Sequence, residues 1–326
     1  MFAYEIEASK ALLAKASRIL VITHIAPDGD AIGALTAVGL GLEQLNKQFT
    51  LACDDQAPNR FSFLTLVDRL QTVLTHNAYD LVIAVDCGDM QRMGCVFADL
   101  PDPKPPIINL DHHVTNTMFG DVNVVDPKAN SATEVLYYWL PALGVTLTPP
   151  LALSLLTGIV TDTLGFRTVG VTPRTFEAAG DLMRAGADLT LVMSEALTLK
   201  PLSTLRLWQM GLNNMRFEDG LLWSVISNEE RKATGFEGIG SAGLVNMLAD
   251  VYQAAIGAVL MAYDDGKVYV SFRCRPPYSV SELALNLGGG GHPLAAGCTL
   301  EGPLSKVQEM VVAMAKETIR SQSQLS

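Results

Sequence analysis

Short apolar runs alternate with longer helical patterns in the first part of the chain. The runs are rich in Val, Ile and Leu and are bounded by turn residues, as the buried strands of a parallel sheet are. They lie at residues 18–23, 80–85 and 106–110. Stretches in which apolar residues return with a helical period cover residues 30–47, 131–140, 150–164 and 172–185. This alternation predicts a doubly wound α/β domain with a parallel sheet.

The pattern loosens around residues 187–205, and we place the domain boundary in that region. We therefore expect a domain over 1–190, a linker over 191–210 and a second domain over 211–326. Strand-like runs in the second domain lie at 221–227, 256–263 and 267–273, and helical stretches lie at 279–287 and 304–320. Asp264-Asp265-Gly266 between two of the runs is a hairpin signal. The second domain is predicted to be a smaller α/β domain.

Composition and charge limit the partners of this chain. It has 326 residues, enough for two domains with separate cores, and 49% of them are hydrophobic. The net charge is −11, from 23 Lys and Arg against 34 Asp and Glu. Sequence-independent affinity for nucleic acid comes mainly from Lys and Arg side chains that neutralise phosphates. Because acidic residues outnumber basic ones, this chain is not expected to bind long nucleic acid.

The cysteines indicate a reducing compartment. There are five, an odd number, and no two form a CxxC pair. With no signal peptide at the N-terminus, we expect free thiols in the cytoplasm. No segment reaches the roughly 18 apolar residues of a membrane span, so no membrane association is expected.

The strongest chemical signal is a histidine with two acids, His24-Ile-Ala-Pro-Asp28-Gly-Asp30, between a predicted strand and a predicted helix. Ligands of open α/β sheets collect beyond the carboxyl ends of the strands, which is where these side chains emerge. Asp30 alone would be an ordinary helix cap. Together, the imidazole and the two carboxylates favour a metal site.

Two other predicted strands end in the same kind of residue. One run ends at Asp86, with Asp89 close behind, and the next ends at Asp111-His112-His113. Carboxylates that converge at one edge repel one another unless a cation neutralises them. Imidazole and carboxylate without thiolate suit Mn²⁺ or another first-row metal, and the number of ligands suits two ions about 3.5–4 Å apart.

A further acid lies at the end of a predicted apolar helix, in Thr157-Gly-Ile-Val-Thr161-Asp162-Thr163. A lone carboxylate is costly to bury, so Asp162 by itself would be expected at the surface. In the company of the other acids and histidines, it becomes a candidate metal ligand.

These four motifs resemble motifs one to four of the DHH phosphoesterase superfamily, in the same order. The run Gly288-Gly289-Gly290-Gly291-His292 resembles the glycine-rich loop of the DHH-associated domain in the RecJ-like branch. The length and the two-domain plan are similar to those of bacterial oligoribonucleases that also dephosphorylate 3′-phosphoadenosine-5′-phosphate. The resemblance implies an active site in the cleft between the two domains.

The resemblance also assigns roles to residues of the first domain. One metal would be held by His24, Asp28 and Asp86. A second would be held by Asp30, Asp86, His112 and Asp162, so that Asp86 bridges the two. His113 would face the scissile phosphate, and Asp111 would orient His112, since metal-bound imidazoles commonly need such a partner. Catalysis would thus depend on His113, Asp86 and Asp111.

In the second domain, the resemblance implies a substrate site formed by Arg273, Gly289, Gly290, Gly291 and His292. A glycine run alone is more often a flexible turn than a phosphate cradle, although its exposed N–H groups can bind an anion. Arg273 alone could equally be a solvated arginine at the end of a strand. As a substrate residue, it would clamp a phosphate or stack on a base.

The predicted activity is hydrolysis of a phosphoester by a hydroxide that two divalent ions activate, most plausibly Mn²⁺, with Mg²⁺ or Co²⁺ as alternatives. The expected substrates are oligonucleotides of about 2–5 nucleotides and 3′-phosphoadenosine-5′-phosphate, because the chain lacks the basic channel of a processive exonuclease. Two alternatives stay open: a phosphodiesterase for cyclic di-AMP or linear diadenylate, and a catalytically inactive nucleotide-binding regulator. The sequence leaves open whether the chain forms a homodimer.

Overall fold

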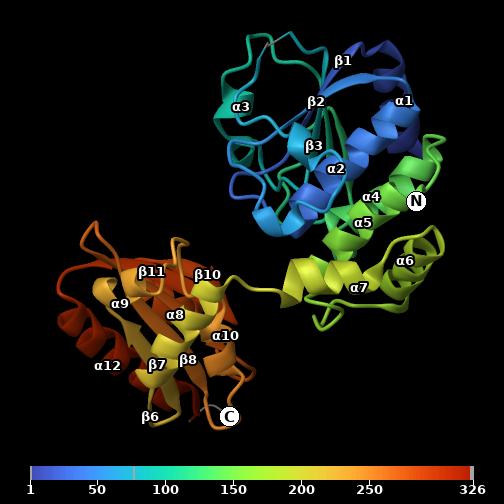
Figure 1. Cartoon of the computed structure of the whole chain (residues 1–326). Coiled ribbons are helices and arrows are strands. Elements are labelled where there is room, and N and C mark those ends of the chain that lie inside the picture. Colours follow the sequence, from blue (N-terminus) through green and yellow to red (C-terminus); the bar gives the residue numbers. More distant parts are fainter. Residues whose placement is uncertain (1, 76–77, 324–326) are drawn as a thin grey trace. The chain divides into compact units, whose positions relative to one another are not determined.

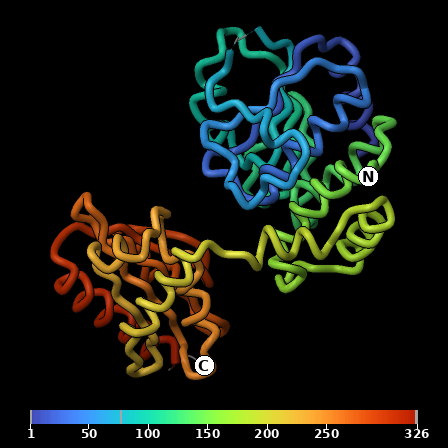
Figure 2. Tube along the Cα trace, in the orientation of Figure 1, coloured from blue at the N-terminus to red at the C-terminus, as the bar shows by residue number. Residues whose placement is uncertain are grey.

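The computed structural model describes residues 2–75 and 78–323. The chain divides into two compact units, Met1–Leu199 and Lys200–Ser326. A single segment of the trace joins them (Figure 2). The division falls within residues 191–210, which the sequence predicts to be a linker, but most of that segment is helical. It contains the end of α7 (Leu189–Val192), a π-helical turn, η4 (Met193–Thr198), and most of α8 (Leu202–Asn213).

The first unit contains a five-stranded sheet with the strand order β2-β1-β3-β4-β5, in which every neighbouring pair is parallel (Figure 1). The strands are β1 (Arg18–Ile22), β2 (Gln48–Ala52), β3 (Leu81–Val85), β4 (Ile107–Asp111) and β5 (Val122–Val125). After β2, the chain returns to the other side of β1 and forms β3. The strand order therefore reverses beside β1, and ligands of open α/β sheets bind at such a point.

Both faces of this sheet are covered, as expected for a doubly wound domain. Alternate side chains of β1 enter two different cores: Ile19 and Val21 pack in the larger one, and Leu20 and Ile22 pack in the smaller one. This explains the nearly continuous apolar runs of the sequence. The helices of the unit other than α7 are α1 (Ala3–Lys15), α2 (Gly29–Gln44), α3 (Gly94–Ala98), α4 (Ala132–Ala142), α5 (Pro149–Asp162) and α6 (Pro173–Arg184), with 3₁₀ turns η1 (Asn59–Phe61), η2 (Val67–Arg69) and η3 (Met90–Met93).

The second unit contains a six-stranded mixed sheet with the order β10-β11-β9-β8-β7-β6, in which only the β7–β8 pair is parallel. Helices cover one face over most of its width and the other face over part of it. The strands are β6 (Arg216–Glu218), β7 (Leu221–Ile226), β8 (Ile256–Ala262), β9 (Lys267–Cys274), β10 (Gly290–His292) and β11 (Ala295–Glu301). The helices other than α8 are α9 (Asn228–Ala233), α10 (Leu244–Ala249), α11 (Ser281–Asn286) and α12 (Leu304–Ser323).

Most of the predicted elements are confirmed. β8 and β9 pair antiparallel on either side of Asp264-Asp265-Gly266, as the hairpin signal predicts. Thr172 caps α6, with Pro173 as its first residue. The glycine run differs from the prediction of a loop, because Gly290, Gly291 and His292 form the edge strand β10. No helix within the described ranges is long and apolar enough to cross a membrane.

Candidate metal centre

The predicted metal ligands of the first unit come together at the carboxyl ends of neighbouring strands. His24 follows β1, Asp86 follows β3 directly, and His112 follows β4. Asp162 is the last residue of α5. The cluster thus lies beside the point where the strand order reverses.

Asp86 is the central carboxylate of this cluster. Its Oδ2 lies 3.4 Å from Nε2 of His24, and its Oδ1 lies 3.7 Å from Nε2 of His112. The same nitrogen of His112 is 3.2 Å from Oδ2 of Asp162. One carboxylate therefore contacts two imidazoles with different oxygens, which is the arrangement that a bridging ligand requires.

The donor atoms of these residues fall into compact sets. His24, Asp28 and Asp86 offer ligand atoms that lie within 4.8 Å of one another, and so do Asp30, His112 and Asp162. Asp86 completes the second set through its contact with His112. A third set of Asp86, Asp111, His112 and His113 has the same compactness.

The environment of Asp86 fits cations at this site. The residue is only 3% exposed, and its Oδ1 has no hydrogen-bond partner. Burial raises the pKa of Asp86 well above its usual range, and the negative charges of four nearby aspartates, Asp30, Asp28, Asp162 and Asp111, raise it further. Its backbone is left-handed, with φ of 57°, which is uncommon for a residue other than glycine. A buried, unpaired carboxylate among other carboxylates is stable as an anion only if a cation neutralises it.

Asp28 and Asp30 also hold the local backbone. Asp28, not Asp30, is the N-cap of α2: its Oδ1 accepts hydrogen bonds from the backbone N–H groups of Asp30 and Ala31. Asp30 is fully buried and accepts from the N–H groups of Ala132 and Thr133 and from the hydroxyl of Thr133. Burial raises the pKa of Asp30. Each acid thus contributes to folding as well as to the donor sets.

Glycines let α2 and α5 approach closely beside these acids. A Cβ added to Gly158 would lie 2.3 Å from Oδ1 of Asp30 and from the hydroxyl of Thr133. A Cβ added to Gly29 would lie 2.4 Å from Thr161. The glycine of the Thr157-Gly158 motif is therefore required by packing, and this packing places the end of α5, with Asp162, next to α2.

The structure corrects the predicted partner of Asp111. Asp111 was expected to orient His112, but its Oδ1 accepts a hydrogen bond of 2.7 Å from Nδ1 of His113. The other oxygen accepts from the amide of Asn116. Nδ1 of His112 lies instead 3.4 Å from the carbonyl of Ala129. The reason is local: the two imidazoles leave the end of β4 in different directions, and only that of His113 turns back to the strand.

The pairing of Asp111 and His113 affects both groups. Burial alone would raise the pKa of Asp111, but hydrogen bonds from His113 and Asn116 and the charge of His113 lower it. The hydrogen bond to Asp111 raises the pKa of His113. His113 is thus a half-exposed imidazole that retains a proton more readily than a free histidine.

In the second unit, four of the five predicted substrate residues lie on one sheet, and Gly289 directly precedes its edge strand β10. Arg273 is on β9, directly opposite Ala295 of β11, and it lies on the face opposite to the buried Phe272. Tyr269 and Ser271 share the face of Arg273 and line a cavity of about 420 Å³ together with Gly289. Gly290, Gly291 and His292 form the exposed edge strand next to β11. A Cβ on Gly290 would meet nothing within 4 Å.

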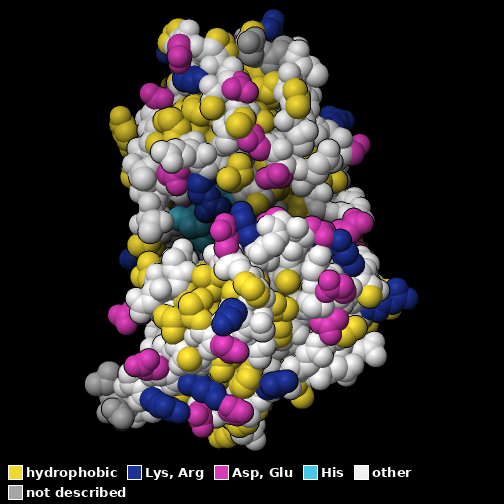
Figure 3. Space-filling view, turned by 90° about the vertical axis from the view of Figure 1, so that its left-hand side faces the viewer, with side chains coloured by type: hydrophobic (Ala, Val, Ile, Leu, Met, Phe, Trp, Pro, Cys, Tyr) yellow, Lys and Arg dark blue, Asp and Glu magenta, His cyan; other side chains and the backbone are white. Residues whose placement is uncertain are grey.

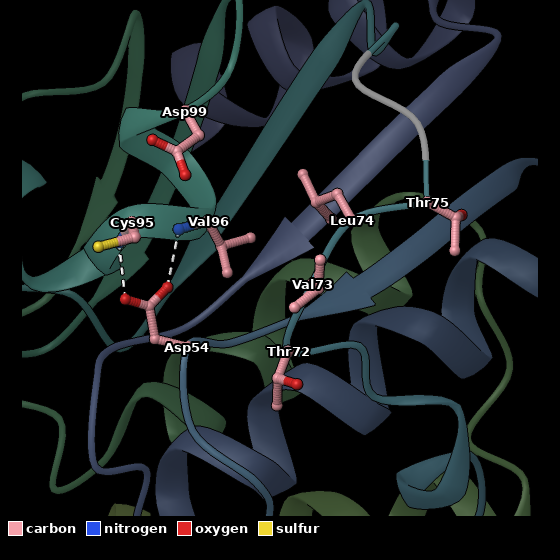
Figure 4. A pocket seen from close by; sticks show the side chains of 8 residues that line it. All are labelled: Asp54, Thr72, Val73, Leu74, Thr75, Cys95, Val96 and Asp99. Carbon is pink, nitrogen blue, oxygen red and sulfur yellow. Dashed lines mark hydrogen bonds between the residues drawn. The ribbon is translucent and has the colours of Figure 1, made fainter.

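A larger cavity of about 640 Å³ lies elsewhere in the first unit, and it is lined by Asp54, Cys95 and Asp99 among others (Figure 4). Asp54 is a structural residue there, since its two oxygens accept hydrogen bonds from the N–H groups of Cys95 and Val96. The charge of Asp54 raises the pKa of the Cys95 thiol, which disfavours the reactive thiolate. All five cysteines are free thiols.

This fold and this cluster of donor atoms define a metal-dependent phosphoesterase of the DHH type. Residues 18–159 match the N-terminal domain of the DHH family, and residues 225–321 match the DHHA1 domain. A bifunctional oligoribonuclease and PAP phosphatase NrnA from Thermus thermophilus is 32% identical over 308 residues, which are 92% of this chain and 90% of that protein. The chain therefore belongs to the DHH family of phosphoesterases, which are hydrolases.

Two solved structures show the same fold. An exopolyphosphatase-related protein from Bacteroides fragilis has a TM-score of 0.86 at 20% identity, with 99% of this chain and 97% of that chain covered. RecJ of Thermus thermophilus, solved in complex with Mn²⁺, has a TM-score of 0.55 at 15% identity, with 98% of this chain and 54% of that chain covered. The predicted relationship to the RecJ-like branch is confirmed at the level of the fold.

Proposed function

We propose that this chain hydrolyses oligonucleotides of about 2–5 nucleotides to mononucleotides and removes a phosphate from 3′-phosphoadenosine-5′-phosphate. The observation that carries the proposal is the buried Asp86, which has an unpartnered oxygen and lies between the two donor sets. The relationship to the Thermus thermophilus oligoribonuclease and PAP phosphatase supports the choice of substrates. A catalytically inactive regulator is disfavoured, because none of the six predicted ligands is replaced.

Two divalent cations fit the donor sets, one at His24, Asp28 and Asp86, and the other at Asp30, Asp86, His112 and Asp162. Imidazole and carboxylate ligands without thiolate favour Mn²⁺, with Mg²⁺ or Co²⁺ as alternatives. When bound, such ions lower the pKa of water toward neutrality and polarise phosphoryl oxygens. The protein's part is to hold the six ligand residues in place on or next to α2, at the end of α5 and at the ends of three strands.

His113 is proposed to bind an oxygen of the scissile phosphate. Its Nδ1 is engaged by Asp111, so Nε2 is the nitrogen that remains for the substrate. The bond to Asp111 raises the pKa of His113 and so favours a proton on Nε2, which would donate to a phosphoryl oxygen whose negative charge increases during the reaction. Asp111 acts through His113 by fixing its orientation.

Arg273, Gly289, Gly290, Gly291 and His292 are proposed to bind the part of the substrate that is not cleaved. The support is that Arg273 shares a face of the sheet with residues that line a cavity, and that the edge strand β10 carries no side chain before His292. Its glycine backbone can approach a nucleotide closely. Burial lowers the pKa of Arg273, but a guanidinium keeps its charge at neutral pH.

Surface charge supports small substrates over long ones. The net charge is −11, and Lys and Arg are interspersed with Asp and Glu on the face shown in Figure 3. A long strand binds by releasing counterions along a continuous basic surface, which this face does not offer. We also keep a cytoplasmic location as a proposal, because the five cysteines are unpaired.

Release of AMP from linear diadenylate tests the proposed function. With Mn²⁺ present, we expect turnover that a chelator abolishes, together with release of phosphate from 3′-phosphoadenosine-5′-phosphate. Asp86→Ala removes the shared ligand and should abolish both reactions, whereas Asp68→Ala, at an exposed aspartate, should leave them unchanged. Substantial activity of Asp86→Ala would contradict the two-metal assignment. Faster cleavage of cyclic di-AMP than of linear diadenylate would instead favour a cyclic dinucleotide phosphodiesterase.

A further inference from the structure

Arg92 is an exposed cation at the border of the acidic cluster, and the sequence patterns do not single it out. It lies in the turn η3, which follows β3 and Asp86. One of its terminal nitrogens, Nη2, is 3.2 Å from Nδ1 of His24. Its positive charge also reaches His113, whose pKa it tends to lower. Arg92 is therefore close to both the first donor set and the imidazole proposed to bind phosphate.

Whether the contact between Arg92 and His24 is a hydrogen bond depends on the tautomer of the imidazole. Nδ1 of His24 also lies 2.8 Å from the carbonyl oxygen of Ile25, which can only accept, and this contact favours the tautomer with the proton on Nδ1. This tautomer leaves the lone pair on Nε2, on the side of Asp86, where a metal ligand needs it. Guanidinium nitrogens can only donate, so Nη2 of Arg92 rests against another donor.

In this tautomer, the guanidinium of Arg92 has no acceptor within the part of the chain that the structure describes. No carboxylate lies within ion-pair distance of it there. Other arginines of the same unit do have such partners: Arg69 pairs with Glu43, and Arg174 pairs with Asp126 and Glu134. An arginine beside several carboxylates that pairs with none of them has its full charge available for a ligand.

The backbone that carries Arg92 is fixed at three points. Asp89 caps the turn by accepting from the N–H groups of Gln91 and Arg92. The carbonyl of Arg92 accepts a hydrogen bond of 2.9 Å from the N–H of Ile25, next to His24. Just after the turn, Asp54 binds the N–H groups of Cys95 and Val96 (Figure 4). A side chain without an acceptor on a backbone held this firmly is preorganised for binding.

Charge balance indicates what Arg92 binds. The proposed metal ligands include four carboxylates, Asp28, Asp30, Asp86 and Asp162, whose charges two divalent cations neutralise. Asp111 is engaged by hydrogen bonds from His113 and Asn116. The phosphate of the substrate would then add a negative charge beyond those that the two cations neutralise. A guanidinium matches two oxygens of a phosphate with two parallel N–H donors.

We propose that Arg92 binds the non-bridging oxygens of the phosphate that is hydrolysed, as a further substrate-binding residue of the metal centre. This inference rests on the proposed function, because it assumes a phosphoester beside Asp86. It adds a binding residue within the first unit to those proposed for the second unit.

The test compares Arg92→Ala and Arg92→Lys with the control Arg69→Ala, an exposed arginine whose ion pair with Glu43 lies outside the centre. Titration calorimetry gives the affinity for Mn²⁺ and, in the Mn²⁺-loaded protein, for AMP. We expect Arg92→Ala to keep its Mn²⁺ affinity, to bind AMP at least about tenfold more weakly, and to lose about 10²–10³-fold in kcat/KM. Arg92→Lys should be intermediate, and Arg69→Ala should match the wild type.

Three results would overturn this inference. Unchanged AMP binding by Arg92→Ala, with a loss in Arg273→Ala instead, would show that Arg273 and not Arg92 binds the phosphate. Weaker Mn²⁺ binding by Arg92→Ala would show that Arg92 only positions His24. If the wild type hydrolyses none of the proposed substrates, the proposed function fails, but AMP binding still decides the role of Arg92. Absence of AMP binding by the Mn²⁺-loaded wild type would also contradict it.

Discussion

At the scale of single residues, the contact between Asp111 and His113 offers a direct test of roles. Asp111→Asn keeps the shape of the side chain but removes its charge, so the pKa of His113 should fall toward its ordinary value. If Asp111 acts through His113, kcat should fall about 10–100-fold while Mn²⁺ affinity is unchanged. Steady-state kinetics and calorimetry on the same preparation separate the two quantities.

The opposite outcome has an equally clear meaning. A loss of Mn²⁺ affinity in Asp111→Asn would mean that Asp111 supports or provides a metal ligand, as its place in the third donor set allows. Asp121→Asn is a suitable control, since Asp121 accepts a single backbone hydrogen bond from Ile107 at the start of the same strand. That variant should change neither quantity.

Residue types at strand ends could be predicted from the sequence, but side-chain directions could not. His24, Asp86 and His112 follow apolar runs, and parallel strands bring such ends together. Whether His112 or His113 contacts Asp111 depends on rotamers at the end of β4, which no spacing encodes. Arg92 gave no signal, because an arginine in a polar turn is usually solvated and only the three-dimensional contacts show that it lacks an acceptor.

At the scale of elements, the close packing of α2 against α5 determines the geometry of the second donor set. Gly158→Ala would place a methyl group against Oδ1 of Asp30 and the side chain of Thr133. Since both contacts are shorter than real Cβ atoms tolerate, α5 must shift and carry Asp162 with it. We expect a loss of about 1–3 kcal/mol in unfolding free energy and weaker Mn²⁺ binding.

Gly180→Ala is the matched control for this variant. Gly180 lies within α6, where an added Cβ meets only the flexible end of Arg184 at ordinary contact distance. Alanine should therefore stabilise the protein slightly, by up to about 1 kcal/mol, and leave metal binding unchanged. Denaturant unfolding with and without Mn²⁺ measures both variants. Equal stability of Gly158→Ala and the wild type would show that α5 has room to adjust.

Elements with strong periodicity were predicted well, and those that depend on distant partners were not. The apolar runs of β1, β3 and β4 are buried on both faces, which makes them visible in the sequence. The edge strand β10 consists of glycines and a histidine, residues that are poor strand formers. It exists because β11 lies beside it, and this pairing is not encoded in the run itself.

At the scale of the whole molecule, the buried acids tie stability to metal and pH. Burial is the largest cause of the raised pKa values of Asp30, Asp86 and Asp162, and burial together with the charges of nearby aspartates raises the pKa of Asp162 to about 9. In the unfolded chain, these groups titrate near pH 4. Without metal, the folded state therefore holds protons that the unfolded state releases, so these three groups make folding less favourable as pH rises above about 4, and Asp162 continues to do so up to about pH 9.

Cations replace those protons, so we expect the stabilisation by Mn²⁺ to grow with pH. The difference in Tm between Mn²⁺-loaded and chelator-treated protein should increase from pH 5.5 to pH 8.

Asp86→Asn separates the cost of the buried charge from the stabilisation by Mn²⁺, because it removes the charge of Asp86 in the metal-free protein. At pH 8, it should stabilise the chelator-treated protein by about 1–3 kcal/mol while abolishing most of the stabilisation by Mn²⁺. The opposite result would be that chelator-treated Asp86→Asn unfolds more readily than the wild type at pH 8. It would mean that other groups of the protein already neutralise the charge of Asp86 without metal, although Oδ1 of Asp86 has no hydrogen-bond partner.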